Sequence, residues 1–169
     1  SEIREGDEYT GYRVALTANY KPMEVPLKLD ITTGDVITPR EICFNYPVML
    51  EERNITVLAY NLETILAEKL ETVISRADLN TRPRDYYDIY ILGSTQPFDR
   101  TVFKEALKAT AVHRGSLEQI KDVTGIFEQI AKSEELKDMW NKYQKKFTYA
   151  SNITFENVLE VLKKLLMDN

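Results

Sequence analysis

Apolar and polar residues alternate along the first third of the chain, which is the pattern of β-strands. Residues 12–18 and 25–32 are apolar at every second position, and the polar segment 19–24 between them is short enough for a hairpin connection. The stretches ICFNYPVML and ITVLAY flank a polar turn at residues 52–54, which predicts a second hairpin. We therefore expect a small mixed or antiparallel sheet at the start of the chain.

The apolar residues recur at helical spacing after Asn61, a residue type that often caps helices. This spacing predicts a helix over residues 62–77, and Pro83 predicts the first turn of a second helix that runs through RDYYDIYIL. Further helices are predicted over 100–113, 117–132, 134–147 and 155–167, preceded by the capping residues Asp99, Ser116, Ser133 and Thr154. Strands followed by helices predict an α+β fold with a helical bundle against the sheet.

The second predicted strand carries a charged pair on its polar face. Lys28 and Asp30 alternate with Leu27, Leu29 and Ile31, so the two charges point away from the apolar side. Two interpretations are open. The charged face is either the solvated side of an edge strand or the wall of a cleft where a phosphate meets a metal ion.

The first predicted helix places Lys69 near the middle of its apolar stripe, between Leu62 and Val73. One explanation is a side chain whose stem packs in the core while its ammonium reaches water. The other is an ammonium that points into a cleft and holds the phosphates of a nucleotide. The helix pattern alone does not separate the two.

The second predicted helix places Asp85 and Asp88 one turn apart, on the face that also carries Leu92. Asp85 could stabilise the helix N-terminus, or one of the two carboxylates could face inward. Arg82 and Arg84 beside them are either a phosphate clamp or ion-pair partners of these acids.

The overall charge limits the possible functions. A net charge of −5 excludes a generally basic nucleic-acid-binding protein and leaves room for a local basic patch. The single cysteine, Cys43, cannot form an internal disulfide, and no apolar run approaches the ~20 residues of a membrane span. These features predict a cytoplasmic protein without membrane contact. The chain enters a strand almost at once, which we interpret as an incomplete N-terminus.

Three stretches together, LKLDITTGD, LETILAEKLETVISR and RPRDYYDIYIL, resemble the AbiEii/AbiGii toxin family. This is a family of nucleotidyltransferase-like proteins that includes the MenT-like toxins of bacterial toxin–antitoxin pairs. The resemblance covers residues 12–92 strongly and the later helices weakly. The matching residues are Asp30 with Gly34 and Asp35, then Glu63 with Ala67, Glu68 and Lys69, and then Arg82 or Arg84 with Asp85 and Asp88.

The resemblance implies transfer of a nucleotide from an NTP to an RNA acceptor such as tRNA, and a cognate antitoxin partner. It implies that Asp30 binds a metal, that Lys69 holds the triphosphate and that Asp85 acts as a base or orienting acid. Substrate contacts are implied for Lys28, Lys69, Arg82, Arg84 and Asp88. Residues 1–60 would be the C-terminal part of a nucleotidyltransferase-like sheet, and residues 61–169 a helical region packed against it.

One family motif has no counterpart in this sequence: a Gly-Ser turn followed by an acidic pair on a strand. Magnesium (Mg²⁺) is therefore expected for a complete family member, whereas this chain offers only Asp30 from its strands. We expect the chain to be inactive by itself. The alternative is a non-catalytic module that binds a nucleotide or a protein on a degenerate nucleotidyltransferase scaffold. In either case we expect Asp30, Lys69 and Asp85 to face one cleft.

Overall fold

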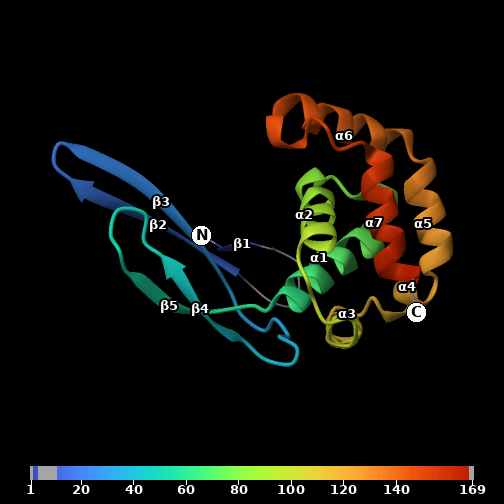
Figure 1. Cartoon of the computed structure of the whole chain (residues 1–169), viewed down its shortest axis with the longest axis horizontal. Coiled ribbons are helices and arrows are strands. Elements are labelled where there is room, and N and C mark those ends of the chain that lie inside the picture. Colours follow the sequence, from blue (N-terminus) through green and yellow to red (C-terminus); the bar gives the residue numbers. More distant parts are fainter. Residues whose placement is uncertain (1, 4–10, 168–169) are drawn as a thin grey trace. The chain divides into compact units, whose positions relative to one another are not determined.

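Two β-hairpins and a helical bundle make up the computed structural model, which describes residues 2–3 and 11–167 (Figure 1). The chain divides into two compact units, Ser1–Asp35 and Val36–Asn169. The first unit contains the strands β1 to β3, and the second contains β4, β5 and the described helices. The predicted α+β class is confirmed.

The first unit is an antiparallel sheet of β1 (Glu2–Ile3), β2 (Gly11–Tyr20) and β3 (Met23–Thr32), in that order. The register pairs Leu16 with Leu27, which places the apolar residues of β2 and β3 on one face. The same register pairs Arg13 with Asp30 on the opposite face. The long hairpin β2–β3 is the one that the alternating pattern predicts.

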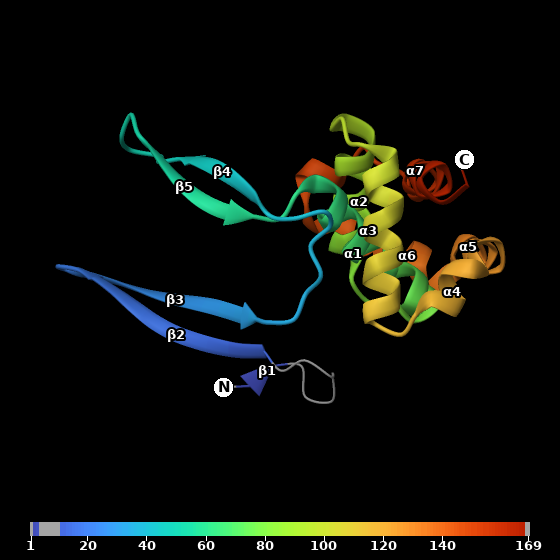
Figure 2. The same ribbon diagram turned by 90° about the horizontal axis from the view of Figure 1, so that it is seen from below.

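The second hairpin joins β4 (Ile42–Pro47) to β5 (Asn54–Ala59), also antiparallel. Its turn closes where the backbone N–H of Val48 donates to the carbonyl of Arg53 at 3.1 Å. Figure 2 shows this hairpin projecting from the helices of its own unit. The second predicted hairpin is therefore present too.

Asn61 connects the base of this second hairpin to the helices. Its side-chain oxygen accepts from the backbone N–H of Thr64 at 2.7 Å, which caps the helix as predicted. Its amide group donates to the carbonyls of Thr38 at 2.7 Å and Arg40 at 3.1 Å. One buried residue thus starts the helix and holds the preceding loop against it.

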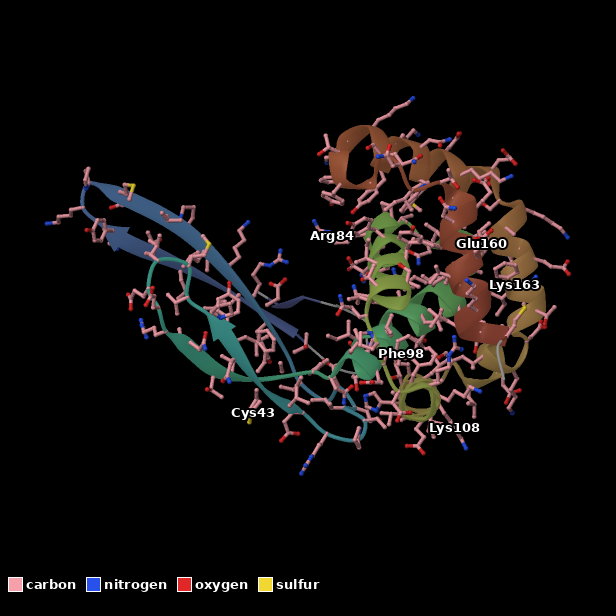
Figure 3. The ribbon with its side chains drawn as sticks, in the orientation of Figure 1. Cys43, Arg84, Phe98, Lys108, Glu160 and Lys163 are labelled. Carbon is pink, nitrogen blue, oxygen red and sulfur yellow. The ribbon has the colours of Figure 1, made fainter. Side chains whose placement is uncertain are left out.

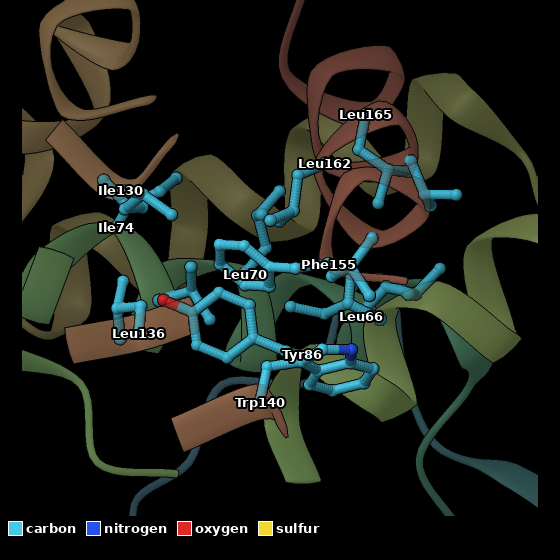
Figure 4. Packing of buried hydrophobic residues seen from close by; sticks show 14 of the residues in the cluster. Leu66, Leu70, Ile74, Tyr86, Ile130, Leu136, Trp140, Phe155, Leu162 and Leu165 are labelled. Carbon is cyan, nitrogen blue, oxygen red and sulfur yellow. The ribbon is translucent and has the colours of Figure 1, made fainter. Parts of the chain in front are cut away.

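The helix α1 (Leu62–Arg76) lies at the centre of the bundle and packs against α2 (Pro83–Thr95) and α3 (Arg100–His113). The remaining helices are α4 (Leu117–Lys121), α5 (Val123–Lys132), α6 (Glu134–Lys146) and α7 (Phe155–Met167), with short 3₁₀ helices at Ala77–Leu79 and Thr148–Ala150. Buried side chains from α1, α2, α3, α5, α6 and α7 form the core, including Leu66, Leu70, Tyr86, Trp140 and Leu162 (Figure 4). This core holds α1 and α2 in a defined orientation.

The structure corrects one predicted helix. Residues 117–132 form two helices, α4 and α5, which are separated at Asp122. The predicted cap, Ser116, makes no side-chain capping bond, because its hydroxyl donates to the buried carboxylate of Glu71 at 2.7 Å. The predicted caps of the other later helices are confirmed at Asp99, Ser133 and Thr154.

Candidate functional site

The ammonium of Lys69 lies between two carboxylates of the neighbouring helix. The distance from Lys69 Nζ to Asp88 Oδ2 is 2.6 Å, and the distance to Asp85 Oδ1 is 3.2 Å. The Lys69 side chain is 24% exposed, so it is half-buried. The lysine within the apolar stripe of α1 is therefore explained by an ion-paired cluster with α2.

Helix geometry explains why both acids reach the same lysine. Asp85 and Asp88 stand one turn apart on α2 and therefore share a face, and α2 packs directly on α1. Pro83 starts α2 at its first position, which places Asp85 in the first turn. The Asp85 and Asp88 side chains are 16% and 28% exposed, so water has limited access to the cluster.

The Lys69 cluster, which we define as Lys69, Asp85 and Asp88, keeps its lysine charged. Burial lowers the pKa of Lys69, but the hydrogen bond and charge of Asp88, followed by those of Asp85, outweigh this effect and raise the pKa above its ordinary value. One ammonium faces two carboxylates, so the cluster has a formal charge of −1. A carboxylate of the cluster can accept a proton from a nearby hydroxyl.

Asp30 belongs to the first unit and is paired with a residue that the sequence analysis did not single out. Its two carboxylate oxygens accept from Arg13 Nε at 2.6 Å and Arg13 Nη2 at 2.7 Å. The hydrogen bond from Arg13 lowers the pKa of Asp30. Both side chains are nearly half exposed. The sequence could have indicated this pair, because a two-residue turn in the hairpin places position 13 opposite position 30.

The other predicted residues of this segment are also in the first unit. Lys28 is an exposed residue of β3, on the same face as Asp30. Asp35 accepts a hydrogen bond from the Thr32 hydroxyl at 3.1 Å, and Gly34 has a φ of 93° that favours glycine. That Asp30 shares a cleft with Lys69 and Asp85 stays a prediction.

Arg82 and Arg84 are exposed at the start of α2 (Figure 3 labels Arg84). Among the described residues neither arginine is ion-paired, and Asp85 and Asp88 bind Lys69 instead. Arg84 lies against α6, where a hydrogen bond to Tyr143 raises the pKa of Arg84. The two arginines are thus available to an anionic ligand.

Both arginines line a groove between the start of α2 and one face of α6, with a volume of about 620 Å³. We call it the α2–α6 groove. Asp85 of the Lys69 cluster is also one of its lining residues, so the groove opens beside the cluster. Its other lining residues are Thr81, Pro83, Glu135, Met139, Lys142, Tyr143, Lys146 and Phe147.

A second buried charge cluster lies on α1 and was missed by the sequence analysis. The Glu71 side chain is 4% exposed and accepts from Arg114 Nη1 and Ser116 Oγ, both at 2.7 Å. Arg114 also pairs with Glu68 at 3.3 Å. The signal in the sequence was the position of Glu71, four residues after Ala67 on the buried side of α1. This cluster fastens the loop after α3 to α1.

The implied magnesium ion does not fit the residues that the structure describes. Both oxygens of Asp30 are bound to Arg13, and Asp85 and Asp88 are bound to Lys69. Within residues 2–3 and 11–167, no three side chains of His, Cys, Asp or Glu gather in a group that could hold a metal ion.

None of the described helices has the length and apolar character needed to cross a membrane.

Comparison with known proteins identifies the family of the chain. Neither the curated proteins nor the solved structures contain a match to the chain. The model of the nucleotidyl transferase AbiEii toxin family, from type IV toxin–antitoxin systems, matches residues 1–161. The chain therefore belongs to the AbiEii nucleotidyl transferase toxin family, which implies a nucleotide substrate and an antitoxin partner.

Proposed function

We propose that this chain is a nucleotidyltransferase-type toxin whose reaction is the transfer of a nucleotide from an NTP to an RNA acceptor such as tRNA, and that the residues present here bind the nucleotide but transfer little or none of it by themselves. The observation that carries the proposal is the Lys69 cluster. It joins three of the residues on which the family resemblance rests, and it lies within the 1–161 match. Half-buried charges beside a groove are typical of functional sites.

Lys69 is proposed to hold the triphosphate. Its ammonium is kept charged by Asp88 and Asp85, and the carboxylates fix its position at the surface of α1. A polyphosphate carries more negative charge than either carboxylate, and it therefore competes with them for the ammonium of Lys69. Arg82 and Arg84 supply two more positive charges beside the cluster, and Lys28 is proposed as a further substrate contact from the first unit.

Asp85 is proposed to act on the acceptor hydroxyl. Its contact to Lys69, at 3.2 Å, is longer than the 2.6 Å contact of Asp88, and Asp85 lines the groove. The acceptor oxygen attacks the α-phosphorus of the NTP, the bond to pyrophosphate breaks, and the hydroxyl proton passes to Asp85. Asp88 keeps the ammonium in place during this step.

A non-catalytic nucleotide-binding module is the second candidate function. The observation that favours it is the pairing of Asp30 with Arg13, together with the lack of a three-residue acidic group among the described side chains. Both candidate functions require nucleotide binding at Lys69. They differ in whether the chain takes part in nucleotide transfer to RNA.

Nucleotide binding tests what the two functions share. ATP affinity is measured by titration calorimetry at several salt concentrations for the wild type, Lys69→Ala and the control Lys163→Ala, an exposed lysine of α7 (Figure 3). We expect weak, salt-dependent binding that falls about tenfold in Lys69→Ala and stays unchanged in the control. Unchanged ATP affinity in Lys69→Ala, with reduced thermal stability, would assign the lysine a structural role and contradict the proposal.

A further inference from the structure

The α2–α6 groove concentrates positive charge in an acidic protein. Arg82 and Arg84 line it from α2, and Lys142 and Lys146 line it from α6. Asp85 and Glu135 are its acidic lining residues, and Asp85 is bound to Lys69. The groove therefore carries a positive formal charge, whereas the whole chain has a net charge of −5.

The four cations of the groove differ in their partners from the basic residues of the ion-paired clusters described above. Lys69, Arg13 and Arg114 each bind a carboxylate. Within the described part of the chain, no acid lies within ion-pair distance of any of the four cations of the groove. All four are exposed. Their charges are consequently free to bind an external polyanion.

The α6 side of the groove also offers an aromatic surface. The ring of Phe147 is half-buried and stacks on the ring of Tyr149, with 5.3 Å between the two centroids. The centroid of the Tyr143 ring lies 4.7 Å from the centroid of the Phe147 ring. The ammonium of Lys146 lies 5.4 Å from the centre of the Phe147 ring. Cations that follow a groove with an aromatic wall are typical of sites for single-stranded nucleic acid, where phosphates meet the charges and bases stack on the rings.

We propose that the α2–α6 groove binds the unpaired end of the RNA acceptor, with its phosphates on Lys142 and Lys146 and a base against Phe147. This inference rests on the proposed function. The volume of about 620 Å³ lies within the roughly 300–1,000 Å³ range of ligand pockets and leaves room for a nucleotide. Because Asp85 lines the same groove, an RNA end bound there lies next to the proposed acceptor of the hydroxyl proton. Duplex RNA stacks its bases internally and cannot offer them to Phe147.

Fluorescence anisotropy with a short labelled single-stranded RNA tests this inference. The variant Lys142→Ala/Lys146→Ala is compared with Lys145→Ala/Lys163→Ala, which removes the same charge from exposed lysines outside the groove. We expect the first variant to lose about tenfold or more in RNA affinity, and its salt slope to fall by about 1.4. The control double variant should keep the affinity within about twofold.

The variant Phe147→Leu separates stacking from charge. It should weaken single-stranded RNA binding about tenfold with little change in the salt slope, since it removes the ring and keeps an apolar side chain. The same RNA annealed into a blunt duplex should bind wild type and Phe147→Leu equally. Trp140, which is buried beside Tyr143, reports by its fluorescence whether each variant is folded. If Phe147→Leu is unfolded, the comparison of Lys142→Ala/Lys146→Ala with its control double variant tests the inference by itself.

The outcomes separate the groove from the proposed function. Loss of RNA binding with unchanged ATP affinity in Lys142→Ala/Lys146→Ala supports the groove. Equal RNA affinity of that variant and its control overturns the inference, while the ATP result with Lys69→Ala still stands. An ATP affinity that falls as much as the RNA affinity assigns the groove to the nucleotide and also overturns it.

Discussion

Lys69 illustrates how a charged side chain is accommodated within an apolar helix stripe. Two carboxylates from α2 compensate its desolvation, and in return the three side chains join α1 to α2 at one point. Removing the ammonium leaves Asp85 and Asp88 facing each other without a cation, and like charges in a half-buried position repel. The stability of the fold should therefore depend on the protonation of Lys69.

The raised pKa of Lys69 predicts a specific pH dependence. A lysine with a higher pKa in the folded state contributes stability that is complete below its unfolded pKa, near 10.5, and is lost as the pH rises through the folded value. Lys69→Met should thus be less stable than wild type at pH 8 to 9, and the difference should shrink above about pH 10.5. Urea unfolding followed by Trp140 fluorescence at each pH measures this. A constant difference across the range, or the same trend in Lys163→Met, would contradict it.

Glu71 should matter more for stability than any exposed acid of the bundle. Glu71→Ala leaves the Arg114 guanidinium and the Ser116 hydroxyl without their buried partner, and we expect a loss of about 2–4 kcal/mol in the free energy of unfolding. Glu118→Ala, whose carboxylate is 81% exposed and pairs with Lys121, should cost less than about 0.5 kcal/mol. Chemical denaturation of both variants measures the difference, and equal losses would show that the Glu71 cluster is energetically unimportant.

The contact between α2 and α7 illustrates a constraint at the scale of elements. Gly93 on α2 faces α7 so closely that an added Cβ would lie 2.9 Å from Val161 Cγ1 and 3.3 Å from Leu165 Cδ1. The glycine therefore permits the close approach of two helices. It also fixes how α2 presents Asp85 and Asp88, because the orientation of α2 depends on its packing.

Gly93→Ala should destabilise the protein even though alanine favours helices. We expect a net loss of about 1–3 kcal/mol, because the methyl group displaces Val161 or Leu165 in a packed contact. Ser94→Ala, the next and exposed position on α2, should stay within about 0.5 kcal/mol of wild type. Thermal unfolding of both variants tests this, and a stabilised Gly93→Ala would show that α7 moves away at little cost.

Catalytic competence is a property of the whole molecule. Nucleotidyl transfer needs several acids to position a metal ion that neutralises and aligns the triphosphate, and the motif acids Asp30, Asp85 and Asp88 are bound to Arg13 or Lys69 instead. Nucleotide binding and nucleotide transfer can therefore be tested separately in this chain.

We expect little or no label transfer when the chain is incubated with labelled NTPs, magnesium and total tRNA, although ATP still binds. Scintillation counting of precipitated RNA measures the transfer, with a reaction lacking the protein as the blank. Robust transfer that disappears in Asp30→Ala would contradict this expectation and would exclude the non-catalytic alternative.

Local features of the sequence were enough to predict most elements. The alternation of apolar residues gave the hairpins, and Asn61, Asp99, Ser133 and Thr154 marked helix starts, because strand faces and helix caps depend on residues only a few positions apart. Ser116 does not cap α4, because its hydroxyl donates a hydrogen bond to Glu71, which is distant in the sequence.

By itself, the sequence determined that Lys69 stands in an apolar stripe, that Asp85 and Asp88 share a face, and which family the chain resembles. Only the tertiary structure decided that these three side chains form one cluster, that Asp30 binds Arg13, and that α2 and α6 form a groove. The α2–α6 groove joins residues near 82 and 146, and the contacts of distant elements depend on how helices pack rather than on local periodicity. The sequence thus sets the helix face on which a charged residue lies, whereas the packing of the helices sets which residue it pairs with and what it can do chemically.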